Sequence, residues 1–308
     1  MKRVLVSNLI MTRDIDRFRP ELEAAGVEAV KADVRQFLTE AELLPIIADF
    51  DGVLAGDDQF TERVLRAGLP RLKVISKWGV GLDSIDLEAA KRLGVQVFNS
   101  PGAFGDAVAE LAIAYMVMLD RKACVIDREV RAGKWPKYEG QGLLGKTLGV
   151  IGHGSIGRGI TARAAAFGMR VLACDPCPGA CECSGVESCC FDDVVTGADY
   201  VVLACNLTAE NRHCMDMAQF KRMRPGARLL NVSRGPLVNE ADLIEALRQG
   251  IVAGAALDVF ETEPVSPDNP LTGMDNVVLG SHNANNVSSA NDYVNRNTIA
   301  NLLRGLGL

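Results

Sequence analysis

Residues 148–158 read Leu-Gly-Val-Ile-Gly-His-Gly-Ser-Ile-Gly-Arg, and the rest of the chain is best interpreted outward from them. The apolar run at 148–151 predicts a buried strand, and Gly152-x-Gly154-x-x-Gly157 follows at once. A helix is predicted over 156–167 and a second strand over 170–174. A strand, a glycine-rich turn, a helix and a strand in this order predict a βαβ unit of a parallel sheet.

The three glycines and the acid that closes the unit predict a dinucleotide site. Gly152 allows a tight turn, Gly154 lets backbone N–H groups approach a pyrophosphate, and Gly157 lets the helix pack closely on the strand. The positive end of the helix dipole suits a diphosphate. Asp175, 18 residues after Gly157, is placed to accept hydrogen bonds from ribose hydroxyls. Its charge favours NAD over NADP, since a 2′-phosphate would meet a like charge. We assign further cofactor contacts to His153, which would face phosphate, Ser155 and Ile156.

Composition narrows the class of protein. The chain has 308 residues, 48% hydrophobic and 23% charged, with a mean hydropathy of +0.11, which is typical of a soluble globular protein of one or two domains. A formal net charge of −6 argues against a nucleic-acid partner. No apolar run approaches the ~20 residues that span a bilayer. We expect a protein of the cytoplasm with no membrane partner.

Strands alternate with helices along both halves of the chain. This pattern predicts an α/β fold with two doubly wound parallel sheets. Strands are predicted at 4–7, 28–31, 51–54, 72–76, 95–99, 200–203, 227–232, 253–259 and 277–280, and helices at 14–25, 86–93, 240–249 and 286–303.

Residues 105–132 predict one long helix that is apolar on all sides. A surface helix has a polar face, so burial between domains or subunits would explain this composition. We therefore expect a homodimer formed through residues 105–145.

Six of the nine cysteines lie within residues 174–190. Structural zinc sites pair two separated CxxC or CxxH units, whereas these thiols crowd into one loop. We expect small residues in a loop beside the adenosine pocket and no metal; metal binding or redox sensing is the alternative. The six are Cys174, Cys177, Cys181, Cys183, Cys189 and Cys190.

Three strands of the second half deliver polar residues to the edge of the sheet at which ligands of open α/β sheets bind. Strand 227–232 is followed by Arg234, strand 253–259 by Glu261 and Glu263, and strand 277–280 by His282. A guanidinium can bind a carboxylate and polarise a carbonyl, and a histidine can donate a proton to an alkoxide. A nearby carboxylate orients the imidazole. These residues suit hydride transfer to a 2-oxo acid.

Five ordered motifs resemble the D-isomer-specific 2-hydroxyacid dehydrogenase family, and the phosphoglycerate-dehydrogenase-like branch is the nearest. They are Lys-Trp-Gly-Val-Gly-Leu-Asp-Ser-Ile-Asp at 77–86, Gly-His-Gly-Ser-Ile-Gly-Arg at 152–158, Asn-Val-Ser-Arg-Gly-Pro-Leu-Val at 231–238, Ala-Leu-Asp-Val-Phe-Glu-Thr-Glu-Pro at 256–264 and Ser-His-Asn-Ala at 281–284.

The resemblance implies roles for particular residues. Glu263, Arg234 and His282 match the catalytic glutamate, arginine and histidine, with His282 as general acid/base. Asp258 matches a carboxylate near the nicotinamide. The substrate-binding residues would be Lys77, Trp78, Gly79, Val80 and Gly81, and the remaining cofactor contacts Cys205, Asn206, Thr208, Val232, Ser233 and Ala284.

The resemblance also implies a domain plan. Residues 1–98 and 283–308 would form a smaller, flavodoxin-like substrate domain. Residues 99–282 would form the Rossmann domain that binds NAD, with the site in the cleft between the two. The long helix and the linker after it match the dimer element of the family.

Two departures bear on the substrate and the cofactor lip. Ala55-Gly56 stands where phosphoglycerate dehydrogenases carry an arginine and a serine, so a phosphate would lose its bidentate partner. Lys77 could still serve an anionic group. Asn206 replaces the proline usual in the lip over the cofactor.

Two other functions remain compatible with these residues. One is an NAD(H)-sensing, corepressor-like binding protein, because such relatives keep the same triad. The other is a dehydrogenase of a small anion of the formate or phosphite type, which uses the same fold.

Overall fold

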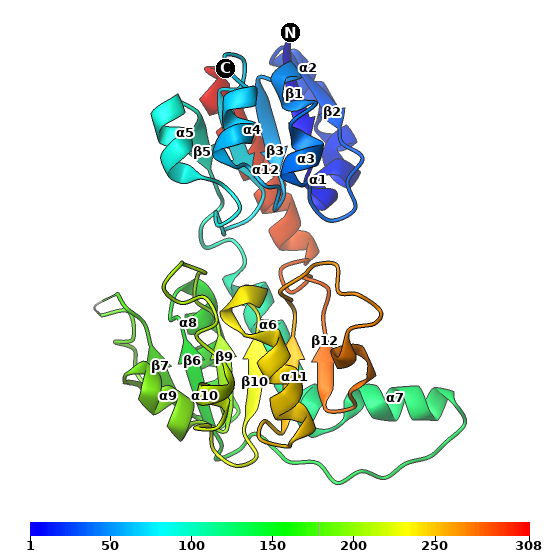
Figure 1. Cartoon of the computed structure of the whole chain (residues 1–308), viewed down its shortest axis with the longest axis vertical. Coiled ribbons are helices and arrows are strands. Elements are labelled where there is room, and N and C mark those ends of the chain that lie inside the picture. Colours follow the sequence, from blue (N-terminus) through cyan, green and yellow to red (C-terminus); the bar gives the residue numbers. More distant parts are fainter. Residues whose placement is uncertain (178) are drawn as a thin grey trace. The chain divides into compact units, whose positions relative to one another are not determined.

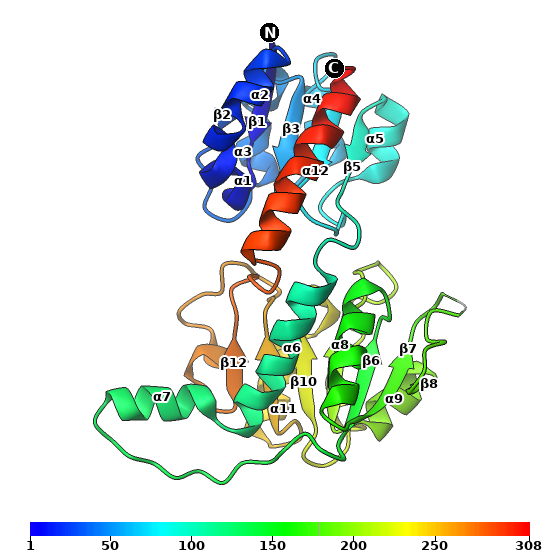
Figure 2. The same cartoon turned by 180° about the vertical axis from the view of Figure 1, so that it is seen from behind.

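The computed structural model describes residues 1–177 and 179–308, and the chain divides into two compact units. Unit 1 consists of Met1–Ala103 and Val287–Leu308, and unit 2 of Phe104–Asn286. The resemblance to the family places the corresponding boundaries at 98/99 and 282/283. Each unit is a parallel sheet with helices on both faces (Figures 1 and 2).

Unit 1 contains a five-stranded parallel sheet in the order β2-β1-β3-β4-β5, as predicted for a flavodoxin-like domain. The C-terminal helix α12 returns to cover one face of this sheet, and α4 covers the other (Figures 1 and 2). The strands are β1 (Lys2–Val6), β2 (Val27–Lys31), β3 (Gly52–Ala55), β4 (Val74–Lys77) and β5 (Gln96–Phe98); the helices are α1 (Leu9–Asp14), α2 (Arg19–Ala24), α3 (Glu40–Leu43), α4 (Glu62–Ala67), α5 (Leu87–Leu93) and α12 (Ser288–Leu306), with short 3₁₀ turns at Ile15–Arg17 and Ile47–Asp49.

The single helix predicted at 14–25 is wrong. The Asn8 side chain accepts the N–H of Met11, so α1 begins at Leu9. A 3₁₀ turn follows α1. Pro20 lies in the first turn of α2, where a backbone N–H would have no partner within the helix. Gly26 ends the segment with φ +76°, a left-handed conformation that glycine adopts readily.

Unit 2 contains a seven-stranded parallel sheet in the order β12-β11-β10-β9-β6-β7-β8, which is the dinucleotide-binding arrangement with one extra edge strand. α6 and α8 cover one face, and α9, α10 and α11 cover the other (Figures 1 and 2). The strands are β6 (Thr147–Ile151), β7 (Arg170–Cys174), β8 (Val186–Ser188), β9 (Tyr200–Leu203), β10 (Arg228–Asn231), β11 (Gly254–Leu257) and β12 (Val277–Leu279); the helices are α6 (Gly105–Asp120), α7 (Ala123–Arg131), α8 (Ser155–Ala166), α9 (Phe191–Gly197), α10 (Met217–Phe220) and α11 (Glu240–Arg248), with 3₁₀ turns at Gly235–Leu237 and Pro270–Gly273.

The long helix predicted over 105–132 is two helices. α6 ends at Asp120, and Lys122 takes a left-handed backbone (φ 50°) before α7 begins. α6 packs on α8 so closely that a Cβ on Gly159 would lie 2.9 Å from the carbonyl oxygen of Gly105. The apolar character of α6 is therefore explained by burial within unit 2.

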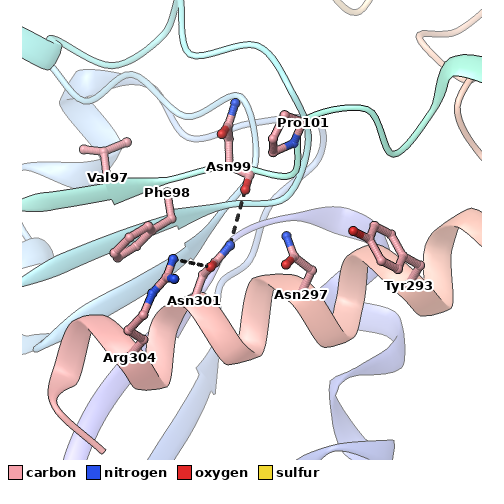
Figure 3. A pocket seen from close by; sticks show the side chains of 8 residues that line it. All are labelled: Val97, Phe98, Asn99, Pro101, Tyr293, Asn297, Asn301 and Arg304. Atoms are coloured by element: carbon pink, nitrogen blue, oxygen red, sulfur yellow. Dashed lines mark hydrogen bonds between the residues drawn. The ribbon is translucent and has the colours of Figure 1, made fainter. Parts of the chain in front are cut away.

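The C-terminal half of α12 is tied to the edge strand β5 across a pocket of about 420 Å³ (Figure 3). Arg304 stacks on Phe98, 4.4 Å from the ring centre, and donates to the Asn301 side chain at 2.8 Å. Asn301 in turn donates to the carbonyl of Asn99 at 3.3 Å, so these polar groups bind one another.

Among the described residues, none of the helices combines the length and apolarity that crossing a bilayer would require.

An ion pair at the amino-terminal edge of the second sheet joins α6 to two strands. Asp120, the last residue of α6, accepts the hydroxyl of Tyr200 and lies 2.6 Å from the guanidinium of Arg228. The Asp120 side chain is 1% exposed and that of Arg228 is 16% exposed. Burial, and then the Asp120 carboxylate, raise the pKa of the Tyr200 hydroxyl above its ordinary value.

Asp120→Ala should lower the free energy of unfolding by about 3–5 kcal/mol, because it leaves Arg228 with an unpaired charge in a mostly buried position. Urea titration followed by circular dichroism measures this. The matched control is Asp127→Ala, which removes an exposed pair with Arg131 and should change stability by about 0.5 kcal/mol or less. Equal effects of the two substitutions would contradict the prediction.

Candidate active site

The glycine turn between β6 and α8 is held by close backbone contacts. Gly152 has φ +93°, and a Cβ there would lie 2.5 Å from the backbone nitrogen of Cys205. A Cβ on Gly157 would lie 2.2 Å from the carbonyl oxygen of Gly152. Any side chain at either position would push the turn apart.

Gly154 differs from its two neighbours because it faces open space. A Cβ there would have no described atom within 4 Å. Gly154 is also the N-cap of α8, and it has no side chain that could cap the first turn of Ser155, Ile156 and Gly157. The N–H groups of this turn and the open space beside them fit the diphosphate of a dinucleotide.

Asp175 is anchored at the carboxyl end of β7. Its two carboxylate oxygens accept the N–H groups of His153 at 2.7 Å and Cys177 at 2.8 Å. The prediction that the His153 ring faces phosphate is wrong. The residue is 0% exposed, and its ring nitrogens contact the carbonyl of Ala180 (2.8 Å) and the hydroxyl of Thr161 (3.1 Å). His153 thus joins the glycine turn to the loop after Asp175.

The segment that follows β9 lies beside the glycine turn. Asn211 organises it by accepting the Thr208 N–H and donating to the Asn206 carbonyl, both at 2.7 Å. The Ser233 hydroxyl donates to the carbonyl of Cys205. The residues predicted to contact the cofactor after β9 and β10, namely Cys205, Asn206, Thr208, Val232 and Ser233, therefore follow adjacent strands of one sheet.

The cysteines of the described chain are all free thiols, and no group of three or more His, Cys, Asp or Glu side chains within residues 1–177 and 179–308 is arranged to hold a metal. Burial raises the pKa of the Cys174 thiol to about 12. Burial also raises the pKa values of Cys181 and Cys189. A raised pKa leaves less of the thiolate, which is the reactive form of a cysteine.

His282 and Glu263 form a hydrogen-bonded pair. The Nδ1 atom of His282 lies 2.8 Å from Glu263 Oε2, and the other carboxylate oxygen of Glu263 accepts the N–H of Phe260 at 3.0 Å. The two side chains are 20% and 17% exposed, so the pair is only partly screened by water. The imidazole is thereby held in one orientation, with Nε2 as the nitrogen on its other side.

Asp258 builds the turn that carries His282. Its carbonyl accepts the N–H of His282 at 2.6 Å, and its carboxylate accepts the N–H groups of Asn283 (3.2 Å) and Ala284 (3.0 Å). The Tyr115 hydroxyl donates to the same carboxylate at 3.1 Å. His282 has φ 53°, a left-handed conformation that non-glycine residues rarely adopt and that these bonds stabilise.

Arg234 follows β10 and is placed by the glycine after it. A Cβ on Gly235 would lie 1.8 Å from the carbonyl oxygen of Phe260, so the Arg-Gly segment packs directly on the loop that carries Glu263. Asn231 holds this segment by donating to the Arg234 carbonyl at 2.8 Å. The structure thus brings the segments carrying Arg234, Glu263 and His282 to the same edge of one sheet.

Tyr115 and Gly280 contribute to this region through their contacts with Asp258. A second histidine–glutamate pair joins His213 Nε2 to Glu261, and the His213 side chain is 35% exposed. Tyr115 lies in the segment that the sequence predicts to be apolar on all sides. A buried tyrosine hydroxyl needs a hydrogen-bond partner, and this requirement was the one indication in the sequence of the bond to Asp258. Gly280 is also required, because a Cβ there would lie 2.2 Å from Asp258 Oδ1.

The predicted substrate residues 77–81 lie in unit 1, at the carboxyl end of β4. Lys77 is 2% exposed, and its ammonium lies 2.7 Å from Asp57 Oδ1. The Trp78 indole donates to Asn295 at 2.7 Å. The loop itself is held by the N–H of Ser100, which donates to the Gly79 carbonyl at 2.8 Å, and by Asn99, which donates to the Val80 carbonyl at 2.6 Å.

Comparisons with known proteins identify the family to which this chain belongs. Residues 113–284 match the family model described as "D-isomer specific 2-hydroxyacid dehydrogenase, NAD binding domain". The chain is 36% identical over 311 residues to a D-3-phosphoglycerate dehydrogenase of Archaeoglobus fulgidus, a match covering 99% of this chain and 58% of that protein. It therefore spans little more than half the length of that relative.

A hydroxypyruvate reductase of Thermotoga maritima is 35% identical over 278 residues, which are 89% of this chain and 90% of that protein. The crystal structure of the TT0316 protein from Thermus thermophilus is 32% identical and superposes with a TM-score of 0.86 over 99% of this chain and 97% of that one. By sequence and by fold, the chain belongs to the D-isomer-specific 2-hydroxyacid dehydrogenase family, and its second unit carries the NAD-binding domain of that family.

Proposed function

We propose that this chain is an NAD-dependent dehydrogenase or reductase that interconverts a 2-oxo acid and a D-2-hydroxy acid. The observation that carries the proposal is the 2.8 Å contact between His282 Nδ1 and Glu263 Oε2 at the carboxyl edge of the second sheet. A histidine oriented by a carboxylate is the arrangement expected of a general acid and base.

The chain's own residues supply binding and proton transfer. Arg234 binds the substrate carboxylate and polarises the carbonyl with its planar set of donors. Glu263 accepts the Nδ1–H of His282, so Nε2 is the atom that gives a proton to the developing alkoxide in reduction and removes it in oxidation. Glu263 also stabilises the imidazolium form that exists before the proton is given up. NADH, when bound, supplies the hydride.

The residues of unit 2 fit this cofactor. The open space at Gly154 and the first turn of α8 suit the diphosphate, and Asp175 suits the ribose. Asp258 has its carboxylate oxygens engaged by Tyr115, Asn283 and Ala284, so we assign it the positioning of the His282 turn in addition to its expected place near the nicotinamide.

The His282–Glu263 pair also distinguishes this function from oxidation of formate. Oxidation of formate to carbon dioxide moves a hydride but exchanges no proton at a substrate oxygen, so it gives an acid/base pair no task. A proton donor held in place therefore favours carbonyl reduction over formate oxidation. A protein that only senses NAD(H) can keep the same pair, so turnover of a 2-oxo acid is what separates that alternative from an enzyme.

We further propose that the protein is a cytoplasmic homodimer formed through residues 105–145. The helix α6 is covered within unit 2, so its apolar side chains do not require a second subunit. The support for a homodimer comes from the segment after α6. Trp135 and Leu144 are 77% and 82% exposed, as expected of side chains that a second subunit would bury.

The proposal is tested by following NADH oxidation at 340 nm with a panel of 2-oxo acids and identifying the product enantiomer. We expect at least one acid to react with kcat/KM above ~10⁴ M⁻¹s⁻¹ and to yield the D-isomer. NADH binding without turnover of any acid would refute the enzyme and favour a sensor.

His282→Ala should lower kcat by about 10²-fold or more, because it removes the group to which we assign the proton transfer. NADH binding, measured by fluorescence titration, should be retained. His213→Ala, which removes the other histidine–glutamate pair, is the matched control and should keep kcat near the wild-type value. Unchanged turnover in His282→Ala would exclude it as the acid.

Asp175→Ser should reduce the preference for NADH over NADPH by about tenfold or more, since it removes the charge that a 2′-phosphate would meet, an effect of about 1.4 kcal/mol. The ratio of kcat/KM values for the two cofactors measures this. Glu182→Gln removes an equal charge from the same loop at an exposed position and should leave the ratio unchanged. A ratio unaffected by Asp175→Ser would mean that Asp175 does not select the cofactor.

A further inference from the structure

The carboxyl ends of β3 and β4 in unit 1 carry an ion pair that the proposed reaction does not use. Lys77, the last residue of β4, is 2% exposed, and its ammonium lies 2.7 Å from Asp57 Oδ1. Asp57 follows β3 within the sequence Ala55-Gly56-Asp57, and its side chain is 36% exposed. The pair therefore has a deeply buried cation and a more accessible anion.

A second carboxylate fixes the turn that presents Asp57. Asp58 is 0% exposed and accepts the Ser7 hydroxyl at 2.5 Å and the N–H groups of Leu38 (2.8 Å) and Gly56 (2.9 Å). Burial raises the pKa of the Asp58 carboxyl, and these hydrogen bonds and the Lys77 charge oppose that rise. The turn at 56–58 is thus held rigidly, and with it the position of Asp57.

The ion pair lies directly against the loop at 79–81. Gly79 has φ +139°, and a Cβ there would lie 3.9 Å from both Cε and Nζ of Lys77. The resemblance to the family implies that the backbone N–H groups of this loop, as well as Arg234, bind the substrate carboxylate. A substrate whose carboxylate is bound there would hold the rest of its short chain within reach of the Lys77–Asp57 pair.

We propose that the Lys77–Asp57 ion pair recognises the side chain of the substrate and selects short 2-oxo acids that end in an uncharged hydroxyl over those that end in a phosphate or a second carboxylate. This inference rests on the proposed function and specifies its substrate class. A hydroxyl can accept a hydrogen bond from the ammonium and donate one to the carboxylate, so it meets both partners without disturbing their pairing.

An anionic substrate side chain interacts unfavourably with the same ion pair. It must either displace Asp57 from a buried cation or lie beside the Asp57 carboxylate, and a like charge in such a place is strongly unfavourable. Lysine also lacks the planar fork with which arginine binds a phosphate through two parallel hydrogen bonds. Asp57 thus acts against charged substrates while Lys77 and Asp57 together favour a hydroxyl.

The first test compares kcat/KM for hydroxypyruvate, 3-phosphohydroxypyruvate and oxaloacetate with NADH in the wild-type chain. We expect hydroxypyruvate to be preferred over each anionic acid by at least about tenfold, or about 1.4 kcal/mol. This comparison needs no variant and so does not depend on whether a variant folds. A wild-type preference for the phosphorylated acid or for oxaloacetate would overturn the inference.

The second test uses Asp57→Asn, which keeps the shape of the side chain and removes the carboxylate that contacts Lys77. We expect the ratio of kcat/KM for 3-phosphohydroxypyruvate to that for hydroxypyruvate to rise at least about tenfold, again about 1.4 kcal/mol. Asp33→Asn removes an equal charge from an exposed site in the same unit and should leave the ratio unchanged. An unchanged ratio in Asp57→Asn would overturn the inference.

Different experimental outcomes would refute the proposed function and the role proposed for the ion pair. If glyoxylate or another acid of the panel is reduced but the ratios above are reversed, the proposed function stands and the role of the ion pair is refuted. If no 2-oxo acid is reduced while NADH binds, the proposed function is refuted and the inference falls with it.

Discussion

The bond between the Asp258 carbonyl and the His282 N–H, together with the three hydrogen bonds to the Asp258 carboxylate, is the constraint on which the site depends. A carboxylate that is 2% exposed is tolerated only when its oxygens are hydrogen-bonded. Tyr115 and the N–H groups of Asn283 and Ala284 meet this need, and in doing so they fix the turn that holds His282 in a left-handed conformation. The orientation of the acid/base side chain thus follows from satisfying a buried charge.

The parallel sheet makes this arrangement possible. The strands β10, β11 and β12 are adjacent and end at the same edge, so residues far apart in the chain follow neighbouring strand ends. Close backbone contact then sets the details, since Gly235 can lie against the Phe260 carbonyl only because it has no side chain. The first sheet uses the same principle on a smaller scale, with Asp57 following β3 and Lys77 ending the adjacent β4.

Much of the fold could be predicted because buried parallel strands are short apolar runs bounded by turn residues. The strands at 170–174 and 200–203 were predicted with their observed bounds. What could not be predicted depends on contacts distant in sequence. The bond between Tyr115 and Asp258 joins residues 143 positions apart, and the burial of the His153 ring depends on where a later loop returns. The break at Lys122 and the short edge strand β8 have no strong local signal.

The central claim is that His282 acts on the ketone oxygen of a 2-oxo acid and Arg234 on its carboxylate. The most direct test is a crystal structure with NADH and oxamate, an unreactive analogue of a 2-oxo acid. We expect His282 Nε2 to lie within hydrogen-bond distance of the analogue's amide oxygen, which takes the place of the ketone oxygen. We also expect the Arg234 guanidinium to contact the analogue's carboxylate, with the His282–Glu263 bond intact. An analogue bound beside the nicotinamide with its amide oxygen away from His282 would contradict the claim.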